Sequence, residues 1–536
     1  MIADMTRMTL PALGSHGEMR HDWRMERSSG QTVRALVAHG RFRGGLWLAL
    51  CLLAVSACTS VPFDAADRAA IRPGANPGQP AYALPVARPE PAQIYPLVSG
   101  EETLATWLDL IGQAKGRIDV MTYIMRADRS GRAVSQALLD AADRGVHVRL
   151  LIDDVFMAMK DDRVGGLTSH PNIDIRAFNP FSRHAPAVLG YVLDHTRVNR
   201  RMHNKALIVD GRTAIVGGRN VGDEYFGQDP YLHFADFDIL LRGGAVGPLS
   251  AGFELYWRDR LAVPYQRLKP RLGSEGAFQA VIEAPGDLGP LPESATARLA
   301  RGKAREWPGK AEFIMDLPSK LSMNPRSAPQ PVAEALYASL RAAQSEVLIV
   351  TPYFVPQDQG SELLESLEER GVDVTVVTNS LATTNHSIVH GTYSRYRDRL
   401  AARGVDFYEI RADAGAILEP GASIPVDRTV MHSKLIIVDR RFVLIGSPNL
   451  DPRSLKLNTE HIYRIDSPAL ARHLSDQWGR IADTAAYHVD VGETGLPRWL
   501  RRKGSDRTTF LPNPDAGFFA RFIAILGGIL PIEEDL

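Results

Sequence analysis

Apolar and polar positions along the chain predict the same β-α-β unit twice. Residues 117–153 read RIDVMTYIMRADRSGRAVSQALLDAADRGVHVRLLID, which is an apolar strand, a loop, an amphipathic helix and a second apolar strand. Residues 346–379 follow the same order, in EVLIVTPYFVPQDQGSELLESLEERGVDVTVVTN. In each unit the helix is predicted to end at an Arg-Gly pair, at 144–145 and at 370–371. Units of this kind form parallel sheets covered by helices, so the pattern predicts an α/β fold.

A second pair of matching segments follows these units. HNKALIVDGRTAIVGGRN spans residues 203–220, and HSKLIIVDRRFVLIGSPN spans residues 432–449. The runs ALIV and LIIV predict strands, and Asp210-Gly211 predicts a turn into a further strand, TAIV. The Arg-Gly pairs are 226 positions apart and the downstream segments 229, which indicates a duplicated domain.

The repeats and the composition between them divide the chain into segments. We expect residues 97–265 and 313–500 to form the two duplicated domains, joined by a linker at 266–312 that is rich in Pro, Gly and charge. Residues 58–96 are rich in Pro and Ala and predict an extended tether. Residues 501–536 are expected to form a tail that contains an apolar helix.

The N-terminal segment, residues 1–57, resembles a bacterial secretory signal of the lipoprotein type. Residues 46–57 are uncharged and follow two arginines, and this run is too short for a bilayer-spanning helix of about 20 residues. The run ends in VSAC at 55–58, which resembles a lipobox and implies lipidation of Cys58. The segment therefore predicts a membrane-anchored lipoprotein of the cell envelope, facing the periplasm. A buried hydrophobic helix is the alternative interpretation.

Composition and charge narrow the class of protein. Of the 536 residues, 45% are hydrophobic and 23% charged, which excludes a disordered, collagen-like or disulfide-rich chain. Lys+Arg and Asp+Glu are both 62, but residues 1–57 hold seven Arg and four acidic residues. A chain that begins at Cys58 therefore has a formal net charge of −3 and no second cysteine for a disulfide. This slightly acidic balance argues against a nucleic-acid partner.

Both downstream segments contain the same polar pattern, His-x-Lys-x4-Asp-x6-Gly-x2-Asn. Its members are His203, Lys205, Asp210, Gly217 and Asn220 in the first copy, and His432, Lys434, Asp439, Gly446 and Asn449 in the second. The chain has only 10 lysines, and two of them occupy equivalent places in the two copies. Recurrence of the whole pattern by chance is negligible, so the pattern predicts a functional site.

The residue types in this pattern suit a phosphoryl group. Alternation along a strand would place the His and Lys of each copy on one face. If the two domains pack about a pseudo-twofold axis, both faces can meet in one pocket. There, Lys and Asn would orient phosphoryl oxygens, and the two imidazoles would divide the roles of nucleophile and acid. The motif aspartates fall at the hairpin ends, so we expect them to support the architecture. The pattern contains no metal-ligand set, so we expect no metal and no cofactor.

The doubled motifs resemble the HKD motifs of the phospholipase D superfamily, over most of residues 95–490. The resemblance implies an α/β fold of two duplicated phospholipase D-like sandwich domains with one shared active site. It implies that one His attacks phosphorus to form a phosphohistidine while the other protonates the leaving alcohol. The implied catalytic set is His203 as nucleophile, His432 as general acid, Lys205, Lys434, Asp210 and Asp439, with Asn220 and Asn449 as phosphate-binding support.

An acidic residue downstream of each motif usually orients the histidine in this superfamily. Asp236 lies 33 residues after His203, and Glu460 lies 28 residues after His432, each followed by an apolar strand run. We therefore expect Asp236 and Glu460 to accept a hydrogen bond from the far ring nitrogen of the histidine in their own half. Surface salt bridges are the alternative interpretation for these two acids.

Further segments resemble the bacterial cardiolipin synthase C group, which transfers a phosphatidyl unit to the glycerol end of phosphatidylglycerol. These segments are GGRNVGDEYF (217–226), YFVP (353–356), TNSLATTNHSIVHGTYSRYRDRL (378–400), GSPNLDPRS (446–454) and LPIEEDL (530–536). The resemblance implies phospholipid substrates and a phosphatidyltransferase. Two interpretations stay open for His390, Tyr393 and Tyr396: they line the acceptor side of the site, or they serve ordinary helix packing.

Other functions remain in competition at this point. A phospholipase D that uses water differs only in the nucleophile that opens the phosphohistidine. A nuclease of the same superfamily is disfavoured by the lipid anchor and the acidic balance, and a catalytically dead lipid-binding lipoprotein by two complete motifs. The apolar run FFARFIAILGGIL at 518–530 predicts a helix that docks on a membrane interface or packs on the core.

Overall fold

The computed structural model describes residues 88–530 apart from 156–166, 183–192, 269–287, 420, 425, 492–495, 504–505 and 511, and it describes residue 533. The expected signal, the lipidation site Cys58 and most of the expected tether lie outside these residues. Within the described ranges no helix has both the length and the apolar character needed to cross a membrane.

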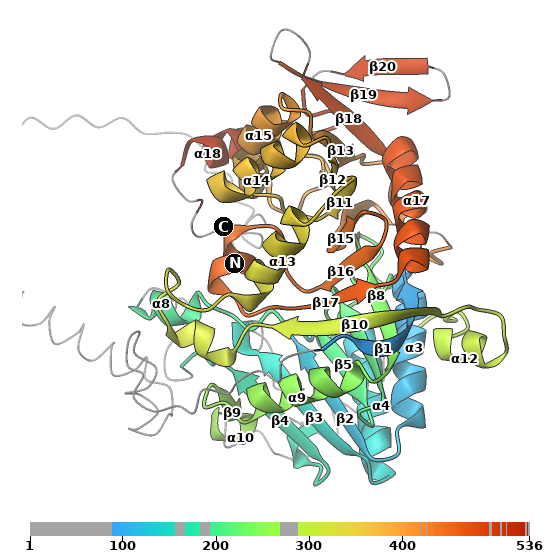
Figure 1. The fold of residues 1–536 in the computed structure, drawn as a ribbon. Coiled ribbons are helices and arrows are strands. Elements are labelled where there is room, and N and C mark those ends of the chain that lie inside the picture. The colour runs from blue at the N-terminus through green and yellow to red at the C-terminus, as the bar shows by residue number, and fades with distance from the viewer. Residues whose placement is uncertain are drawn as a thin grey trace, which may run out of the picture. The chain divides into compact units, whose positions relative to one another are not determined.

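Both predicted β-α-β units are present, and each is formed by two parallel strands connected by one helix (Figure 1). Their elements are β2 (Arg117–Thr122), α4 (Arg129–Asp143), β3 (His147–Asp153), β11 (Glu346–Val350), α14 (Gln357–Glu369) and β12 (Asp373–Asn379). Both helices end at the predicted Arg-Gly pairs, where Gly145 and Gly371 have φ angles of 90° and 78°. Glycine adopts this left-handed conformation without a steric penalty, which explains the helix ends.

The strands form one continuous hydrogen-bonded sheet of 18 strands in which a single strand order occurs twice. The first half, residues 90–268, runs β9 (Ala262–Pro264), β4 (Ile173–Phe178), β3, β2, β5 (Ala206–Val209), β6 (Thr213–Gly217), β8 (Asp238–Gly243) and β1 (Glu90–Leu97). The second half, residues 307–510, runs β18 (Ala486–Val491), β13 (Asp406–Ile410), β12, β11, β15 (Leu435–Val438), β16 (Phe442–Gly446), β17 (His461–Asp466) and β10 (Trp307–Met315). Antiparallel pairing of β1 with β10 joins the halves, so the duplication predicted from the sequence is confirmed.

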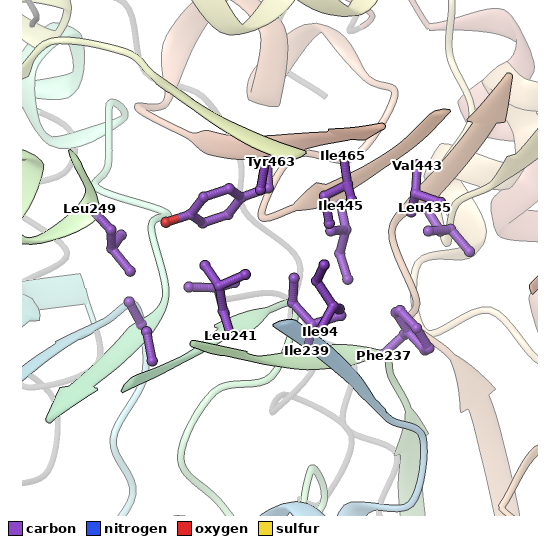
Figure 2. Packing of buried hydrophobic residues seen from close by; sticks show 14 of the residues in the cluster. Ile94, Phe237, Ile239, Leu241, Leu249, Leu435, Val443, Ile445, Tyr463 and Ile465 are labelled. Carbon is purple, nitrogen blue, oxygen red and sulfur yellow. The ribbon is translucent and has the colours of Figure 1, made fainter. Parts of the chain in front are cut away.

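A shared hydrophobic core lies between the inner faces of the two half-sheets. Figure 2 shows Ile239 and Leu241 of β8 on one side, and Ile445 and Ile465 of β16 and β17 on the other. Tyr463 of β17 reaches across this core, and its hydroxyl donates to the carbonyl of Ala245 at 2.8 Å. Helices α9 (Val246–Trp257) and α17 (Pro468–Ala485) bury side chains in the same core. Apolar burial between the halves therefore stabilises their packing.

Helices cover the outer face of each half-sheet. Helices α3 (Gly100–Gln113) and α4 pack on the first half, and α13 (Pro331–Arg341), α14 and α15 (Ser387–Ala401) pack on the second. A separate two-stranded parallel sheet joins β7 (Leu232–Ala235) of the first half to β14 (Arg428–Met431) of the second. The remaining described elements are η1 (Leu167–Ser169), α8 (His195–Val198), α10 (Tyr265–Leu268), α12 (Ala295–Ala300), η2 (Pro318–Ser322), α16 (Gly415–Leu418), the π-helix η3 (Arg453–Leu457), β19 (Pro497–Lys503), β20 (Asp506–Phe510) and α18 (Phe518–Ile529).

Three expected segment boundaries differ from the structure. Strand β1 uses residues 90–96 of the expected tether, because Ile94 and Leu97 are fully buried despite the flanking prolines. Strand β10 begins at Trp307, inside the expected linker, because it pairs along β1. The β19–β20 hairpin extends the second half-sheet beyond β18 and so includes the start of the expected tail.

Candidate active site

Each motif is carried by a β-hairpin whose turn contains the motif aspartate. Hairpins β5–β6 and β15–β16 pair antiparallel, and Asp210 and Asp439 have φ angles of 51° and 53° in their turns. The Asp210 carboxylate accepts backbone N–H groups of Lys115, Gly116 and Arg117 at 3.0, 2.8 and 2.9 Å. Asp439 accepts the N–H groups of residues 344–346 in the same way. Both aspartates therefore attach the hairpin to the start of a neighbouring strand.

The motif glycines are required by the strands that pass beside them. A Cβ atom on Gly217 would lie 2.0 Å from Asp238 Oδ1 and 2.5 Å from the carbonyl oxygen of Phe237. A Cβ atom on Gly446 would lie 2.0 Å from the carbonyl oxygen of His461. Since these neighbours directly follow Asp236 and Glu460, the glycines allow the acid-bearing strands to approach the hairpins closely.

The two histidines and the two acids pair across the halves. His203 Nδ1 lies 3.0 Å from both carboxylate oxygens of Glu460, and His432 Nδ1 lies 2.5 Å from Asp236 Oδ2. The expectation that each acid orients the histidine of its own half is therefore wrong. All four residues are buried, and the alternative of surface salt bridges is excluded. One site is thus assembled from both halves.

Backbone pairing between the halves explains this exchange of partners. The N–H of His203 donates to the carbonyl of Thr459 at 2.9 Å, and the N–H of His432 donates to the carbonyl of Ala235 at 2.8 Å. In the second case β14 runs parallel to β7 and brings Met431 opposite Ala235. Each motif histidine therefore lies beside the residue that precedes the other half's acid. Spacing along the chain cannot show such a pairing, because it depends on how the halves pack.

Strand alternation is not what orients the motif His and Lys. Strands β5 and β15 begin at Ala206 and Leu435, directly after each lysine. Instead, Lys205 Nζ donates to the carbonyl of His203, and Lys434 Nζ donates to the carbonyl of His432, both at 2.6 Å. These bonds fold each lysine back beside its histidine, so that the ammonium groups and imidazoles share one buried environment.

The two buried lysines make the site suitable for an anion. Burial lowers the pKa of Lys205 to about 7 and also lowers the pKa of Lys434. Lys434 Nζ lies 3.9 Å from Asp236 Oδ2, and Glu460 acts electrostatically on both lysines. A negatively charged ligand beside these ammonium groups would offset their desolvation.

Both imidazoles are held in the neutral form near pH 7. Burial, with the charges of Lys205 and Lys434, lowers the pKa of His203 well below its ordinary value. Burial and Lys434 lower the pKa of His432 to about 4, although Asp236 opposes the shift. A neutral ring that donates Nδ1–H to a carboxylate has an unprotonated Nε2, which is the form needed for nucleophilic attack.

The two carboxylates differ in charge state. Burial alone would raise the pKa of Asp236, but Lys434, His432 and Arg219 bring it down to about 2. Burial raises the pKa of Glu460 to about 7, with Lys205 opposing this shift. Asp236 therefore stays ionised throughout the physiological range, whereas Glu460 is close to its titration point.

Aromatic rings enclose both histidines. The ring of Tyr123 packs edge-on against His203 with centroids 5.0 Å apart, and Lys205 Nζ lies 5.4 Å from the centre of the same ring. The ring centroids of Phe234 and Tyr225 lie 5.1 and 5.6 Å from that of His432. These contacts restrict the ring orientations and leave the histidine side chains only 11% and 9% exposed.

The motif asparagines bind loop atoms of their own halves. Asn220 Oδ1 accepts the N–H of Ile124 at 3.2 Å, and Asn449 Nδ2 donates to Asp451 at 3.3 Å. Asn449 Oδ1 is buried and has no hydrogen-bond partner among the residues that the structure describes. The expected contact of Asn220 and Asn449 with phosphoryl oxygens stays a prediction.

Sequence reasoning missed a pair of equivalent residues that support the histidines. Asp153 accepts the N–H of Met202 at 2.9 Å, and the Asn379 side chain exchanges two hydrogen bonds with Met431 at 2.7 and 3.0 Å. Each therefore fixes the residue before a motif histidine. Both are polar residues that end otherwise apolar strands, 226 positions apart, and this signal could have found them.

The three side chains of α15 that were left open serve packing. His390 and Tyr393 are buried in the second half, where the Tyr393 hydroxyl bonds to Glu409 at 3.1 Å. The hydroxyl of Tyr396 donates to Glu533. The helix-packing interpretation accounts for all of these contacts.

The doubled hairpins and the histidines paired across the halves define the class of the protein, which is that of the phospholipase D-type enzymes. A family model described as "Cardiolipin synthase, PLD-like domain" matches residues 107–230 and 336–481, and the chain belongs to this family. This confirms the resemblance to the phospholipase D superfamily.

Individual relatives agree with this assignment. The chain is 33% identical over 475 residues to cardiolipin synthase C of Escherichia coli (strain K12), across 84% of this chain and 98% of that protein. It is 28% identical over 385 residues to the cardiolipin synthase of Geobacillus thermodenitrificans (strain NG80-2), across 69% of this chain and 63% of that protein. Among solved structures, the phosphatidylserine synthase of Haemophilus influenzae Rd KW20 shares the fold, with a TM-score of 0.55 and 15% identity over 83% of this chain and 97% of that one.

Proposed function

We propose that this protein is a phosphatidyltransferase that makes cardiolipin from phosphatidylglycerol and a second phospholipid through a phosphohistidine intermediate. The observation that carries the proposal is the pair of buried imidazoles, each held at Nδ1 by a carboxylate of the other half and flanked by a buried lysine. Similarity to cardiolipin synthase C over most of both chains supports the choice of lipid.

The first step forms a bond between phosphorus and a histidine. Nε2 of neutral His203 attacks the phosphodiester, a P–N bond forms, and the P–O bond to the leaving alcohol breaks. The bound phosphodiester anion offsets the charge of the lysines, so His432 beside the ionised Asp236 takes up a proton, and its imidazolium form gives that proton to the departing oxygen. The lysines stabilise the negative charge on the phosphoryl oxygens as the bond order changes.

The second step reverses these proton movements. The neutral His432 removes the proton from a glycerol hydroxyl of phosphatidylglycerol, and that oxygen attacks the phosphatidyl-histidine. The P–N bond breaks, His203 returns to its neutral form, and cardiolipin is released. Water in place of the glycerol hydroxyl would give phosphatidic acid.

The two carboxylates support this division of roles. Asp236 remains ionised, so it stabilises a positive charge on His432 once the phosphodiester anion is bound. Glu460 has a raised pKa and gives weaker support for a charged ring, which suits a histidine that must attack in the neutral form. His203 is therefore assigned as the nucleophile and His432 as the general acid.

Product analysis tests this function. The purified chain is incubated with phosphatidylglycerol, with and without phosphatidylethanolamine, and the lipids are resolved. We expect cardiolipin, and we expect His203→Ala and His432→Ala each to abolish its formation. Phosphatidic acid without cardiolipin would instead favour a hydrolase, and full activity in either variant would contradict the shared two-histidine site.

We also propose that the chain is anchored by lipid at Cys58 and faces the periplasm. The support is the lipobox-like VSAC at 55–58 after an uncharged run. Labelled fatty acid should be incorporated into the wild-type chain in bacterial cells and not into Cys58→Ser. Equal labelling of both chains would contradict the anchor.

A further inference from the structure

Large apolar side chains are exposed along one short segment of the chain. Of the eleven exposed large hydrophobic residues that the structure describes, seven fall within residues 518–530. They are Phe518, Phe519, Phe522, Ile525, Leu526, Ile529 and Leu530. The exposed fractions of Phe518, Phe519 and Ile529 are 86%, 66% and 74%. Contiguous exposed apolar surface of this kind marks an interaction site.

The small residues of α18 face the protein and fix the helix in place. A Cβ atom on Gly391 would lie 1.9 Å from the carbonyl oxygen of Ala524, and one on Gly527 would lie 2.1 Å from the carbonyl oxygen of Ile388. The hydroxyl of Thr392 donates to the carbonyl of Gly527 at 3.1 Å. Helices α15 and α18, which lie side by side in Figure 1, are thus in backbone contact.

This arrangement is the reverse of that of an ordinary surface helix. A helix that packs on a core buries its large apolar side chains and exposes its small or polar ones. In α18 the side packed against α15 presents Ala524 and Gly527, while the phenylalanines point away from the protein. The apolar face is therefore available to an outside partner without any rearrangement of the fold.

The charge on α18 favours an anionic partner. Arg521 is the only charged residue of the helix, and its guanidinium donates to the carbonyls of Pro512, Asn513 and Ala516 at 2.7, 2.6 and 3.0 Å. Since carbonyl oxygens do not neutralise the guanidinium, α18 itself carries one positive charge beside its apolar face. A bilayer that contains phosphatidylglycerol offers both acyl chains and anionic headgroups to such a surface.

Two contacts and one electrostatic effect connect α18 to the active site. Ile388, which meets Gly527, lies near the start of α15, and the preceding Asn385 accepts the Tyr353 hydroxyl at 2.7 Å. Burial raises the pKa of Tyr353, and the charge of Asp236 adds to this effect. Asp236 in turn binds His432. The docked helix would therefore lie beside the elements that enclose the catalytic histidine.

We propose that residues 518–530 form a membrane-docking face that lies in the interface of an anionic bilayer and brings the active site to its phospholipids. The choice of lipid rests on the proposed function. The helix lies in the plane of the interface, with its phenylalanine and isoleucine side chains among the upper acyl chains and Arg521 at the headgroups.

The test uses the full chain and vesicles of phosphatidylethanolamine and phosphatidylglycerol at about 3:1. The variant carries Phe519→Ser, Phe522→Ser and Ile529→Ser, and the matched control carries Tyr231→Ser, an exposed aromatic residue outside α18. Amide hydrogen exchange across residues 518–530 is measured with and without vesicles. This readout is local to the helix, so an N-terminal anchor does not mask it.

Activity is measured in parallel on the same vesicles and on a monomeric short-chain phosphatidylglycerol. We expect vesicles to protect residues 518–530 from exchange in the wild type and the control only. We expect kcat/KM on vesicles to fall by about 100-fold in the triple variant, from three lost side-chain insertions, with activity on the monomeric lipid unchanged.

The remaining outcomes overturn one proposal or the other. Absence of protection by vesicles, or unchanged vesicle activity in the triple variant, would overturn the docking face. Protection that depends on protein concentration without vesicles would overturn it in favour of a second copy of the chain. Vesicle protection without turnover of either substrate would support docking and contradict the proposed function.

Discussion

Each catalytic histidine is paired with the acid of the other half, so substitution of an acid in one half should affect the histidine in the other half. Replacing Glu460 by Gln should disturb His203, although 257 positions separate them, and replacing Asp236 by Asn should disturb His432. Hydrogen bonds to charged groups contribute about 1.5–3 kcal/mol, and one pKa unit corresponds to about 1.4 kcal/mol. Asp236 stays ionised, so Asp236→Asn should lower the pKa of the His432 imidazole by about 1–2 units. Burial raises the pKa of Glu460 and lowers that of His203, so Glu460→Gln should move the His203 signals by removing the hydrogen bond, with a smaller change in the His203 pKa.

The assay is a pH titration of imidazole signals by NMR in a chain with labelled histidine. Assignment comes from the spectra of His203→Ala and His432→Ala, which each lack one signal. Glu460→Gln should move the His203 signal more than the His432 signal, and Asp236→Asn should do the opposite. A larger movement of the His203 signal in Asp236→Asn than in Glu460→Gln would contradict the exchanged pairing of acids and histidines.

The same substitutions should reduce turnover. The carboxylate fixes the ring tautomer, and losing such an orienting group costs about 10⁴-fold in a related arrangement of His and Asp. We expect kcat to fall by about 10³–10⁴-fold in each variant. Because each acid acts through its histidine, adding Asp236→Asn to His432→Ala should cause little further loss.

Four further predictions concern charge, turns and packing. First, kcat/KM should fall as the pH rises through about 7, because Lys205 is charged only below its lowered pKa, and Lys205→Arg should move this limb to higher pH in a pH–rate profile. Second, Asp153→Ala should lower the free energy of unfolding by about 3–5 kcal/mol in urea titrations, because it removes the carboxylate paired with the buried guanidinium of Arg201. As a control, substitution of the exposed Asp174 by Ala should lower the free energy of unfolding by at most about 1 kcal/mol. Third, Asp210→Ala should lower the melting temperature while kcat stays within about tenfold, since its carboxylate binds backbone amides of the hairpin; a loss of kcat as large as that of His203→Ala would contradict this. Fourth, Gly217→Ala should greatly reduce soluble folded protein on expression, because its Cβ would overlap a neighbouring carboxylate; a normal yield would show that the strand can move aside.

Much of the fold could be predicted because it depends on local pattern. The strands ALIV and LIIV, the helices that end at Arg-Gly and the duplication all follow from periodicity and spacing along the chain. Strand β1 was missed because its prolines are typical of an extended tether, whereas its position between β8 and β10 depends on pairing with distant residues.

Some features of the site could likewise be predicted from the sequence, and others could not. The residue types and the spacing of the motifs identify His203, Lys205, His432 and Lys434, since these appear twice in the chain. The partner of each histidine could not be predicted, because the pairing of β7 with β14 and of Met202 with Thr459 arises only when the halves pack.

In the proposed mechanism a phosphatidyl group passes through His203 in a site built from both halves. The most direct measurement is mass spectrometry of the chain after turnover of phosphatidylglycerol and an alkaline quench, which preserves phosphohistidine. We expect a phosphatidyl adduct on the peptide that contains His203, and its conversion into cardiolipin when more phosphatidylglycerol is added before the quench. An adduct on His432, or cardiolipin formed with no adduct on either histidine, would contradict it.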